Sequence, residues 1–537
     1  MKFMLALLCI PALSIKAQEV KTSKEFNVTL GNPYEVIDGQ KEYYSYNGNA
    51  ISVKRRGDEV YIQKYDAAKA TQKSVKTYTD FPSKYWVLGE VALNEKLYFL
   101  FFEKVKGTEG LTISAREISY EKGEFIGKSK EILTINEKVS RSGGFGIRIG
   151  GGGGYPSEDI SIISSFDKSH FVIQYRLVPE NRRDDINFDK IGMAVFNANL
   201  EREWHESATM PYTEALMNNI DYAVDKNGVV FILAEVFKEK SRNKYDKEGN
   251  ANFKYSVISV FEKELEENKA GVELTNKKIN QIAFFDGPKD ELLLAGFYGN
   301  KKPFNIDGIF AVKLEKDGTM IDEKSYEIPV ELMKQYVSER AQRKMDKKDD
   351  EGADLSLSNM VLRQIVFNED GSTIFIAEKY YVVSHYNPQT KTTTYTYYYQ
   401  EILASKINPD GELAWMKKLP KMQFGNSGRG GMSYKYIQSG SNHYFLFLDN
   451  LKNLELAENK YPASHQDGRG GYLTAYKVAD EDGATQKLSL FDLKNAKGTA
   501  LYQFQVDRII DVMENVMLVE CYKKGKEDVL IKIEIKD

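Results

Sequence analysis

The chain has 537 residues, of which 42% are hydrophobic, 12% aromatic and 28% charged, and this composition excludes a globally disordered protein. A formal net charge of −4, with basic residues scattered among acids, argues against nucleic-acid binding. The 34 Tyr and 28 Phe, without long Leu/Ala runs of helical period, indicate a mostly β protein.

The first element in chain order is an export signal. Lys2 begins it, an apolar run follows, and the small residue Ala17 ends it. Such a segment is too short to span a bilayer and is typical of a cleaved signal peptide at residues 1–17. A leucine precedes Cys9 where a lipid-anchored cysteine needs a small residue, which argues against a lipoprotein. We therefore expect an exported mature chain, periplasmic or extracellular, with no transmembrane span and with a single domain at 18–537.

A pattern of strand, short polar turn and strand recurs along this mature chain. The clearest copies are VFNANLEREWHESATMP (195–211), VFEKELEENKAGVELT (260–275), VKLEKDGTMIDEKSYEIP (312–329), SKINPDGELAWMKKLP (405–420) and YKVADEDGATQKLSLF (476–491). Two further strand-like runs precede each copy, which makes groups of four strands with a period of about 50–70 residues. This grouping predicts an all-β fold, a β-propeller of about eight four-stranded blades, or seven if the weak first two groups merge. A pair of β-sandwiches is the alternative, although it does not require the hairpins to keep one order and turn position.

The two ends of the chain complement each other. After residue 500 the sequence supplies three strands and then stops, one short of a blade. The segment EFNVTL (25–30) can supply the missing strand from the other end. We expect the N- and C-terminal strands to share one blade, because a ring closed in this way has no open sheet edge.

Three insertions interrupt the repeats, and the third is a pair of Gly-rich segments, GNSGRGG (425–431) and DGRGG (467–471), which predict mobile loops around blade seven. The Gly-rich stretch 141–156 has no GK[ST] and no helical pattern after it, so it predicts a flexible loop and not a phosphate site. The stretch 329–354 predicts a short helical insertion, because Met333, Val337 and Ala341 share one face at a spacing of four. Its second half is a charge run, which is typical of a solvated segment.

A tyrosine-rich hairpin, EKYYVVSHYNPQTKTTTYTYYYQEI (378–402), joins the second and third strands of blade six. Alternation about an NPQTK turn makes both of its faces aromatic. Near the ring, packing between blades explains the tyrosines. Nearer the tip we single out His385, Tyr386, Tyr395 and Tyr397, which have less sheet to cover them. They either hold the hairpin together through cross-strand pairs or present apolar faces with a polar tip to a sugar or a protein partner.

The usual motifs of catalysis and metal binding are missing from the sequence. There is no G-x-S-x-G, and GNSGRGG has a serine in the wrong frame. The five histidines are dispersed, without H-x-x-x-H or H-E-x-x-H, so we expect no metal site and no cofactor. The Asp-Gly turns lack the three spaced acidic positions of a calcium loop. The mature chain keeps one cysteine, Cys521, which the alternation places in a buried strand without a disulfide partner.

Catalysis by paired carboxylates in the central channel stays open. The charged residues that the probable innermost strands offer are Asp159, Asp221, Arg363, Lys435, Arg508 and Asp511. The sequence does not show that any two acids face each other.

Two resemblances bear on the fold. SKINPDGELAWMKKLP is similar to the outer-strand repeat of quinoprotein-type propellers, but only Trp415 matches it well, with Trp204 as a partial second. Because that family repeats its docking Trp in most blades, the likeness implies shared architecture without the cofactor. The run SNMVLRQIVFNEDGSTIFIAEKYYVV, the hairpin and YYYQEILASKINPDGELAWMKKLPK together resemble a family of uncharacterised exported bacterial proteins with propeller-like repeats. That resemblance implies fold and export and assigns no site.

Two classes of function follow. The first is a non-enzymatic binding or scaffold protein of the bacterial cell envelope, which engages a protein or a glycan through loops on one face of the propeller. The alternative is a propeller glycan hydrolase or lyase that uses channel carboxylates. The missing catalytic motifs favour the binding or scaffold protein, and the sequence predicts no catalytic residue.

Overall fold

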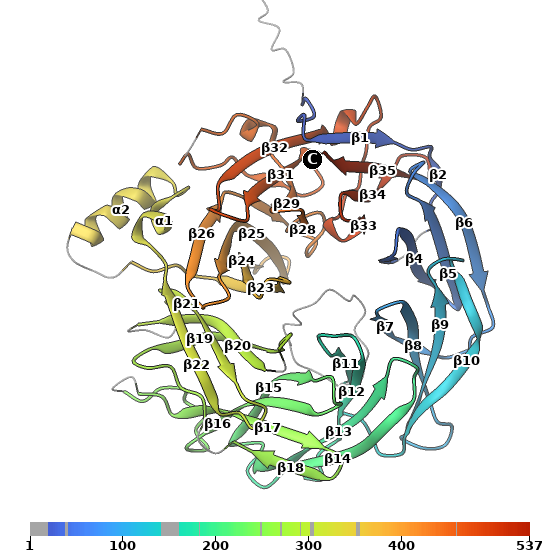
Figure 1. The fold of residues 1–537 in the computed structure, drawn as a ribbon, viewed down its shortest axis with the longest axis vertical. Coiled ribbons are helices and arrows are strands. Elements are labelled where there is room, and N and C mark those ends of the chain that lie inside the picture. The colour runs from blue at the N-terminus through green and yellow to red at the C-terminus, as the bar shows by residue number, and fades with distance from the viewer. Residues whose placement is uncertain are drawn as a thin grey trace, which may run out of the picture.

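The computed structural model describes residues 20–37, 41–140, 160–181, 183–247, 250–268, 271–289, 291–300, 305–350, 355–457 and 459–536. Within these ranges the strands form eight sheets that stand around a central axis in chain order (Figure 1). The prediction of an all-β propeller is confirmed, with eight blades and not seven. The predicted signal peptide, 1–17, and the predicted loop, 141–156, lie outside the described residues.

Each blade begins with its innermost strand, and the first four blades follow one another in chain order. Blade one holds β3 (Lys41–Tyr46), β4 (Asn49–Arg56), β5 (Glu59–Asp66) and β6 (Thr71–Tyr78). Blade two holds β7 (Trp86–Leu93), β8 (Lys96–Lys104), β9 (Leu111–Ser119) and β10 (Glu124–Ile135). Blade three holds β11 (Ile160–Ser164), β12 (His170–Arg176), β13 (Phe188–Asn197) and β14 (Arg202–Thr213). Blade four holds β15 (Met217–Val224), β16 (Val230–Phe237), β17 (Phe253–Phe261) and β18 (Glu264–Glu267).

The later blades carry the additions that distinguish this ring. Blade five holds β19 (Lys278–Asp286), β20 (Leu292–Gly299), β21 (Gly308–Leu314) and β22 (Met320–Glu327). Blade six holds β23 (Met360–Phe367), β24 (Thr373–Asn387), β25 (Thr392–Ile407) and β26 (Leu413–Leu419), with the short strands β27 (Gln423–Gly425) and β30 (His465–Gln466) added beside β25. Blade seven holds β28 (Lys435–Ser439), β29 (Asn442–Asp449), β31 (Tyr472–Ala479) and β32 (Thr485–Asp492). Blade eight holds β33 (Ile509–Met513), β34 (Val516–Lys523), β35 (Glu527–Ile535) and β1 (Phe26–Leu30), with β2 (Tyr34–Glu35) against β35. Three short 3-10 helices are η1 (Leu451–Asn453), η2 (Leu493–Asn495) and η3 (Val506–Arg508).

The position of a strand in its blade follows from its residue pattern. A second strand is covered on both faces by the neighbouring blades, and β16, VFILAEVF, is buried at every position. An outermost strand is half solvated, and β6, TQKSVKTY, alternates partly buried with exposed residues along most of its length. The sequence pattern therefore fixes which strands lie at the rim of the ring.

The hydrophobic core is divided between the blades. Among the described residues it forms eight clusters, one at each junction of neighbouring blades. Phe231 and Phe310 meet between blades four and five, and Leu446 packs in the cluster that also holds Val519 between blades seven and eight. Each sheet is thus stabilised on both faces, and no blade has a core of its own.

The ring closes as the sequence predicts, by pairing β1 from the N-terminal end with β35 from the C-terminal end. The register runs from Phe26 opposite Ile535 to Leu30 opposite Ile531. On the other side of this blade, Nζ of Lys41 in blade one lies 2.7 Å from Glu520 and 3.0 Å from Asp528, and all three charged groups are buried. Burial raises the pKa of Glu520, but the charge of Lys41 outweighs it and the pKa lies below its usual value. A β ladder with apolar pairs on one face and a buried ionic contact therefore join the two ends.

The helical insertion is predicted at 329–354. Its described part, which ends at residue 350, contains two helices. Pro329 caps α1 (Val330–Lys334), and α2 (Glu339–Asp350) follows after a break in which Tyr336 has φ +54°. The expectation of one face shared by Met333, Val337 and Ala341 is wrong, because this left-handed residue interrupts the helix. Met333 is buried against blades five and six, and Lys334 holds α2 through Asp346 and Asp349 at 2.9 and 2.7 Å.

Two further predictions concern single features. Cys521 lies on β34, fully buried and not in a disulfide, as the alternation predicts. Among the described residues, no helix combines the length and apolar character that crossing a membrane requires.

Candidate functional site

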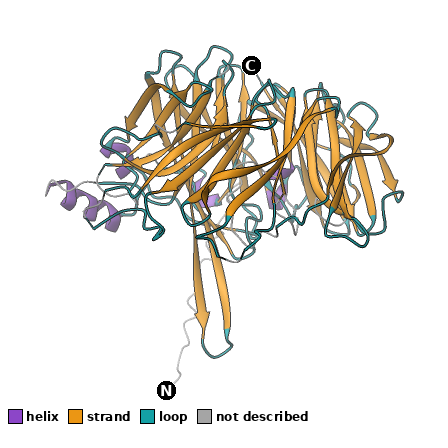
Figure 2. Cartoon of the chain, turned by 90° about the horizontal axis from the view of Figure 1, so that it is seen from below, coloured by secondary structure: helices purple, strands orange, loops and turns teal. Residues whose placement is uncertain are grey.

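The strands β24 and β25 continue past their blade as a hairpin. They have 15 and 16 residues, and Figure 2 shows the hairpin projecting from one face of the ring. The turn is closed by Asn387, whose Oδ1 accepts from the N–H of Gln389 at 2.9 Å, and Lys391 takes φ +52°. The side chain of Asn387 thus replaces a backbone acceptor, which is why this residue type suits the turn.

The register of the hairpin sorts the predicted site residues between its faces. Ser384 lies opposite Tyr395, Val382 opposite Tyr397 and Tyr386 opposite a threonine, so Tyr386, Tyr395 and Tyr397 share one face. We call these three residues, with Val382, the tyrosine face. Exposed fractions are 56% for Tyr386, 49% for Tyr395 and 41% for Val382.

His385 does not join this group. It lies opposite Thr394, which places it on the other face of the hairpin. The structure therefore brings together three of the four residues singled out from the sequence. The fourth is exposed beside Val383 and the threonine row of β25.

Where the hairpin leaves the ring, its tyrosines pack as the sequence predicts. The rings of Tyr380 and Tyr399 lie 4.8 Å apart, and those of Tyr381 and Tyr398 are stacked at 4.7 Å. The guanidinium of Arg363 lies over the first pair, 5.2 Å from Tyr380 and 5.8 Å from Tyr399. Cation–π contact and stacking thus fix this part of the hairpin.

A largely buried ionic group lies beside these rings. We call Glu378, Arg363, Lys421 and Ser433 the base cluster. A carboxylate oxygen of Glu378 lies 2.8 Å from Nζ of Lys421, and the other accepts from Nε of Arg363 at 3.0 Å and from Oγ of Ser433 at 2.9 Å. Burial raises the pKa of Glu378, but the charges of Lys421 and Arg363 outweigh it and hold the pKa below its usual value. Glu378 is therefore ionised where β24 leaves the ring.

The far edge of β25 is supported by an added strand. Residues of β27 pair with β25 from Tyr397 opposite Gly425 to Tyr399 opposite Gln423, and Phe424 lies 6.1 Å from Tyr398 ring to ring. The strand β30 then pairs with β27 in parallel. The hairpin thus leaves the ring from a widened sheet.

The tip of the hairpin carries almost no charge. Between Lys379 and Glu401 the sequence contains no acid, and its ionisable cations are Lys391 and His385. Tyrosine, threonine and valine make up most of the remainder. A rigid, uncharged surface with exposed rings is suited to contact with another macromolecule.

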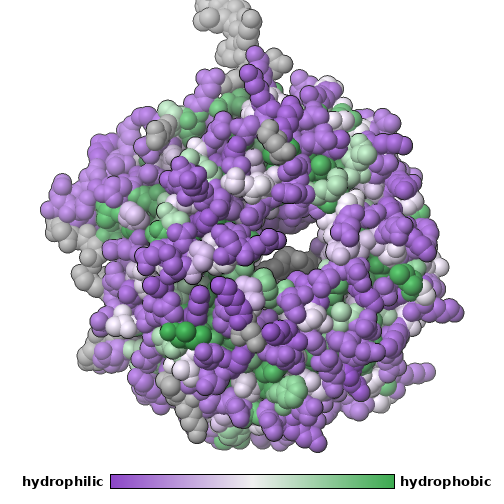
Figure 3. Space-filling model, viewed as in Figure 1, coloured by the Kyte–Doolittle hydropathy of each residue, from purple (hydrophilic) through white to green (hydrophobic). Residues whose placement is uncertain are grey.

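The channel residues proposed as an alternative site are dispersed. Figure 3 shows an opening near the axis of the ring, on a face that is mostly hydrophilic. Asp159 lies outside the described residues, and Asp221 and Asp511 lie on β15 and β33, in opposite blades of the ring. Arg363 belongs to the base cluster. Burial raises the pKa of Asp511 above its usual value, because it outweighs the opposing effect of the Lys435 charge.

Asp221 is also occupied by backbone contacts. Its two oxygens accept from the N–H groups of Tyr222 at 2.9 Å and of Phe284 at 3.0 Å. Burial raises the pKa of Asp221 to about 6, although these two hydrogen bonds act to lower it. Phe284 is on the innermost strand of the next blade, so Asp221 joins two blades and is not presented to a substrate.

The innermost strand β7 carries a further acid, Glu90, that no sequence pattern predicts. Glu90 on β7 accepts from the hydroxyl of Tyr44 on β3 at 2.9 Å. Burial raises the pKa of Glu90 to about 7, and the nearby charge of Glu42 adds to the shift. No local motif marks Glu90, because its neighbours come from the preceding blade.

Among the described residues, no three His, Cys, Asp or Glu side chains are grouped to hold a metal ion. The Asp-Gly turns are held by their own backbone. At Asp370 the carboxylate accepts from the N–H of Ser372 at 2.8 Å, while Gly371 takes φ +88°.

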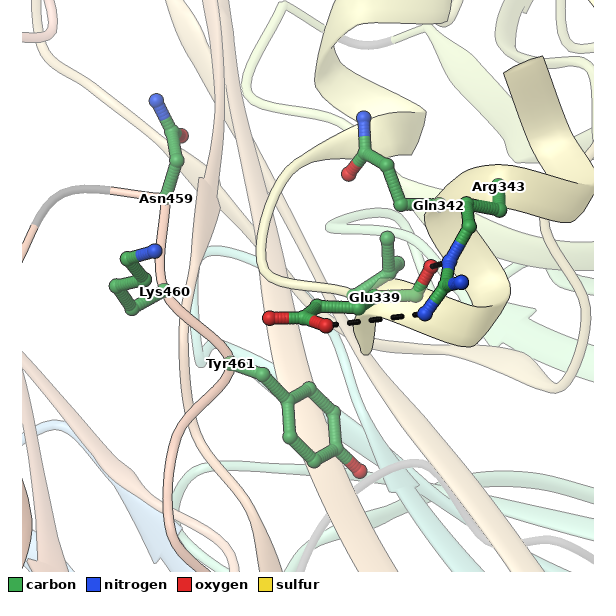
Figure 4. Close-up of a pocket in the computed structure, with 7 residues that line it drawn as sticks. Glu339, Gln342, Arg343, Asn459, Lys460 and Tyr461 are labelled. Atoms are coloured by element: carbon green, nitrogen blue, oxygen red, sulfur yellow. Dashed lines mark hydrogen bonds and ion pairs between the residues drawn. The ribbon is translucent and has the colours of Figure 1, made fainter.

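A hollow of about 550 Å³ opens between α2 and the segment 459–461 (Figure 4). Glu339 and Arg343 on α2 face it and pair with each other at 3.8 Å, and both are exposed. Tyr461 lines the opposite wall. Lys460 lines the same wall as Tyr461, and the charged side chains around the hollow are on the surface, so it is an open hollow and not an enclosed ligand pocket.

Comparison with known proteins leaves the family open. No family model and no curated protein matches the sequence. The chain is similar to a prolyl endopeptidase structure at 9% identity and a TM-score of 0.39, over 90% of this chain and 55% of that one. It is similar to the WD40 domain of SCAP from fission yeast at 8% identity and a TM-score of 0.35, over 96% of this chain and 97% of that one. It is similar to an apocarotenoid oxygenase of Synechocystis at 6% identity and a TM-score of 0.33, over 71% of each chain.

The chain thus spans about half the length of the prolyl endopeptidase. At these identities and TM-scores, the similarities assign neither a family nor an activity to this chain. The resemblance to uncharacterised exported bacterial proteins stays a prediction.

Proposed function

We propose that the protein is a non-enzymatic binding or scaffold protein of the bacterial cell envelope, and that it engages a protein partner through the tyrosine face of the hairpin. The observation that carries the proposal is the projection of exposed Tyr386 and Tyr395 from a sheet whose base is fixed by buried charges. The envelope location rests on the export signal predicted at residues 1–17.

The chemistry of the face supports a protein partner over a glycan. Tyrosine buries a large area at a small cost in conformational entropy, and it is enriched in the centres of protein interfaces. Val382 is exposed at 41% on the same face as these rings, and an aliphatic side chain favours an apolar protein surface. The lack of acids on the hairpin removes the carboxylates with which a sugar-binding site would hold hydroxyl groups.

A glycan hydrolase or lyase remains the second candidate, with weaker support. Retaining and inverting glycosidases need two carboxyl groups about 5–10 Å apart. Asp221 is hydrogen-bonded to backbone, and Asp511 is on the opposite side of the ring. Glu90, with its pKa of about 7, is the described acid whose protonation suits such chemistry best.

Affinity capture from envelope extracts tests the proposal. The tagged mature chain is compared with Tyr395→Ala/Tyr397→Ala, in which the face loses two rings on β25. A matched control is Tyr502→Ala, which removes a tyrosine of similar exposure, 46%, outside the hairpin. The proposal predicts a specific protein that the control retains and the double variant loses. Equal recovery by all three, or recovery of a polysaccharide in place of a protein, would contradict it.

A further inference from the structure

Along part of its length, β24 has an open edge. The N–H of Tyr380 donates to the carbonyl of Asn359 at 2.9 Å, at the point where β23 begins. Asn359 has φ +59°, which turns the preceding chain away from the hairpin. From Tyr381 to Asn387, β24 pairs only with β25 among the described strands.

The alternation of the strand tells which backbone groups face this edge. Because the N–H of Tyr380 points toward β23, every second residue after it points the same way. Val382, Ser384 and Tyr386 therefore turn their N–H and C=O groups to the open side. The residues between them, Tyr381, Val383, His385 and Asn387, turn their backbone groups to β25 instead.

This edge lacks the devices that protect exposed edges elsewhere in the ring. An open strand edge is usually blunted by charges, proline or a bulge. The outermost strand β10 carries Lys128, Lys130 and Glu131, and β18 is ELEE. The segment 381–387, YVVSHYN, has no acid, no lysine, no proline and no register shift. Such an edge is a template for a further strand.

The other edge of the same hairpin has already been extended in this way. There β27 adds to β25 from Tyr397 to Tyr399, and the joint is within one chain. Strand addition is therefore compatible with the twist and side chains of this hairpin.

We propose that the open edge of β24 pairs with the same edge of a second copy of this chain, antiparallel about a two-fold axis at Ser384. In this register Ser384 meets Ser384, and Val382 of each copy meets Tyr386 of the other. Each of these residue pairs exchanges two backbone hydrogen bonds. Val383 of each copy then lies opposite His385 of the other, so the segment is complementary to itself and no like charges meet.

The pairing is compatible with the shape of the molecule. At ~3.3 Å per residue, hairpins paired over this segment hold the two rings face to face, roughly 25 Å apart. The Lys391 side chains, in the turns, lie at opposite ends of the joint sheet. The inference goes beyond the proposed function, because it uses the edge of the hairpin, while partner binding uses its tyrosine face. The two tyrosine faces become continuous in the dimer.

Light scattering coupled to gel filtration tests the dimer on the mature chain. Ser384→Lys places two ammonium groups opposite each other at the axis, where like charges disfavour pairing. Thr393→Lys is the matched control, because Thr393 is exposed on the same face but on the β25 edge. We expect wild type and Thr393→Lys at twice the monomer mass and Ser384→Lys at the monomer mass. A monomeric wild type, or a dimeric Ser384→Lys, would overturn the proposal.

A cysteine at the axis tests the register separately. Ser384→Cys should form an interchain disulfide under mild oxidation, whereas Thr393→Cys should not, and the buried Cys521 is common to both. Equal crosslinking of the two variants would overturn the proposal, and so would a monomer that captures a strand of a different protein at this edge. Failure of the proposed function is distinguishable, because Tyr395→Ala/Tyr397→Ala should lose capture and keep the dimer mass.

Discussion

The base cluster gives the sharpest prediction about how the hairpin is held. Lys421→Met removes the ammonium from a site where both it and the carboxylate of Glu378 are inaccessible to water, 2.8 Å apart. Methionine keeps a similar volume, and besides the charge the change removes only the hydrogen bond that Nζ of Lys421 donates to Oε1 of Gln423 at 3.2 Å. Glu378 is then buried with Arg363 and Ser433 as its remaining partners.

The magnitude follows from these contacts. Removing one partner of a buried ion pair costs about 3–5 kcal/mol, because the other charge is left uncompensated. The bonds from Arg363 and Ser433 remain, so we expect the lower end, about 3 kcal/mol. An exposed pair such as Lys523 and Glu527, 3.0 Å apart, gives the contrast: Lys523→Met should cost less than about 1 kcal/mol.

Native-state hydrogen exchange measures this locally. The free energy of opening should fall at the amides of β24 and β25 in Lys421→Met, and remain unchanged in blade three. The double variant Glu378→Gln/Lys421→Met removes both charges and should recover most of the loss. A fall below about 1 kcal/mol in the single variant, or no recovery in the double variant, would show that the charge of Lys421 does not stabilise the hairpin.

Two further predictions concern the ring. Because burial raises the pKa of Glu90 to about 7, the folded state favours its neutral form, and stability should decline as pH rises from about 4.5 to about 7; Glu90→Gln should remove this decline. At pH 8 the Glu90→Gln variant should melt at a higher temperature than wild type, by the equivalent of about 3 kcal/mol at most, and at pH 4 the two should melt at the same temperature. Equal melting temperatures at pH 8 would contradict a raised pKa for Glu90. Asn27 and Glu534 are hydrogen-bonded across β1 and β35 at 2.8 Å, so Asn27→Cys/Glu534→Cys should form an intrachain disulfide in the native protein. Asn27→Cys/Glu327→Cys, with its second cysteine in blade five, should not, and equal oxidation of the two pairs would contradict the closed ring.

Much of the fold could be predicted because it depends on local sequence patterns. The repeat of alternating strands gave the blades, and the incomplete last group pointed to the segment 25–30 as its fourth strand. The helical insertion was placed correctly, but its break at Tyr336 was not, since tyrosine gives no sequence signal for the left-handed conformation. Local periodicity thus predicts elements better than it predicts their interruptions.

The site was predictable only in part. Alternation assigned the two faces of each strand correctly, but which face of β25 matches which face of β24 depends on register. His385, Tyr386, Tyr395 and Tyr397 were grouped by their place near the tip, and the pairing shows that the three tyrosines share one face and His385 lies on the other. The base cluster could not be foreseen, because Lys421 follows a proline between strands and meets Glu378 only in the folded chain.

The most direct test of the binding role is photo-crosslinking in living cells with a benzophenone amino acid at position 395 or at position 502. We expect an adduct at 395 that contains one defined envelope protein and is absent at 502. Identical adducts at both positions, or no adduct at 395 beyond a second copy of this chain, would contradict that role.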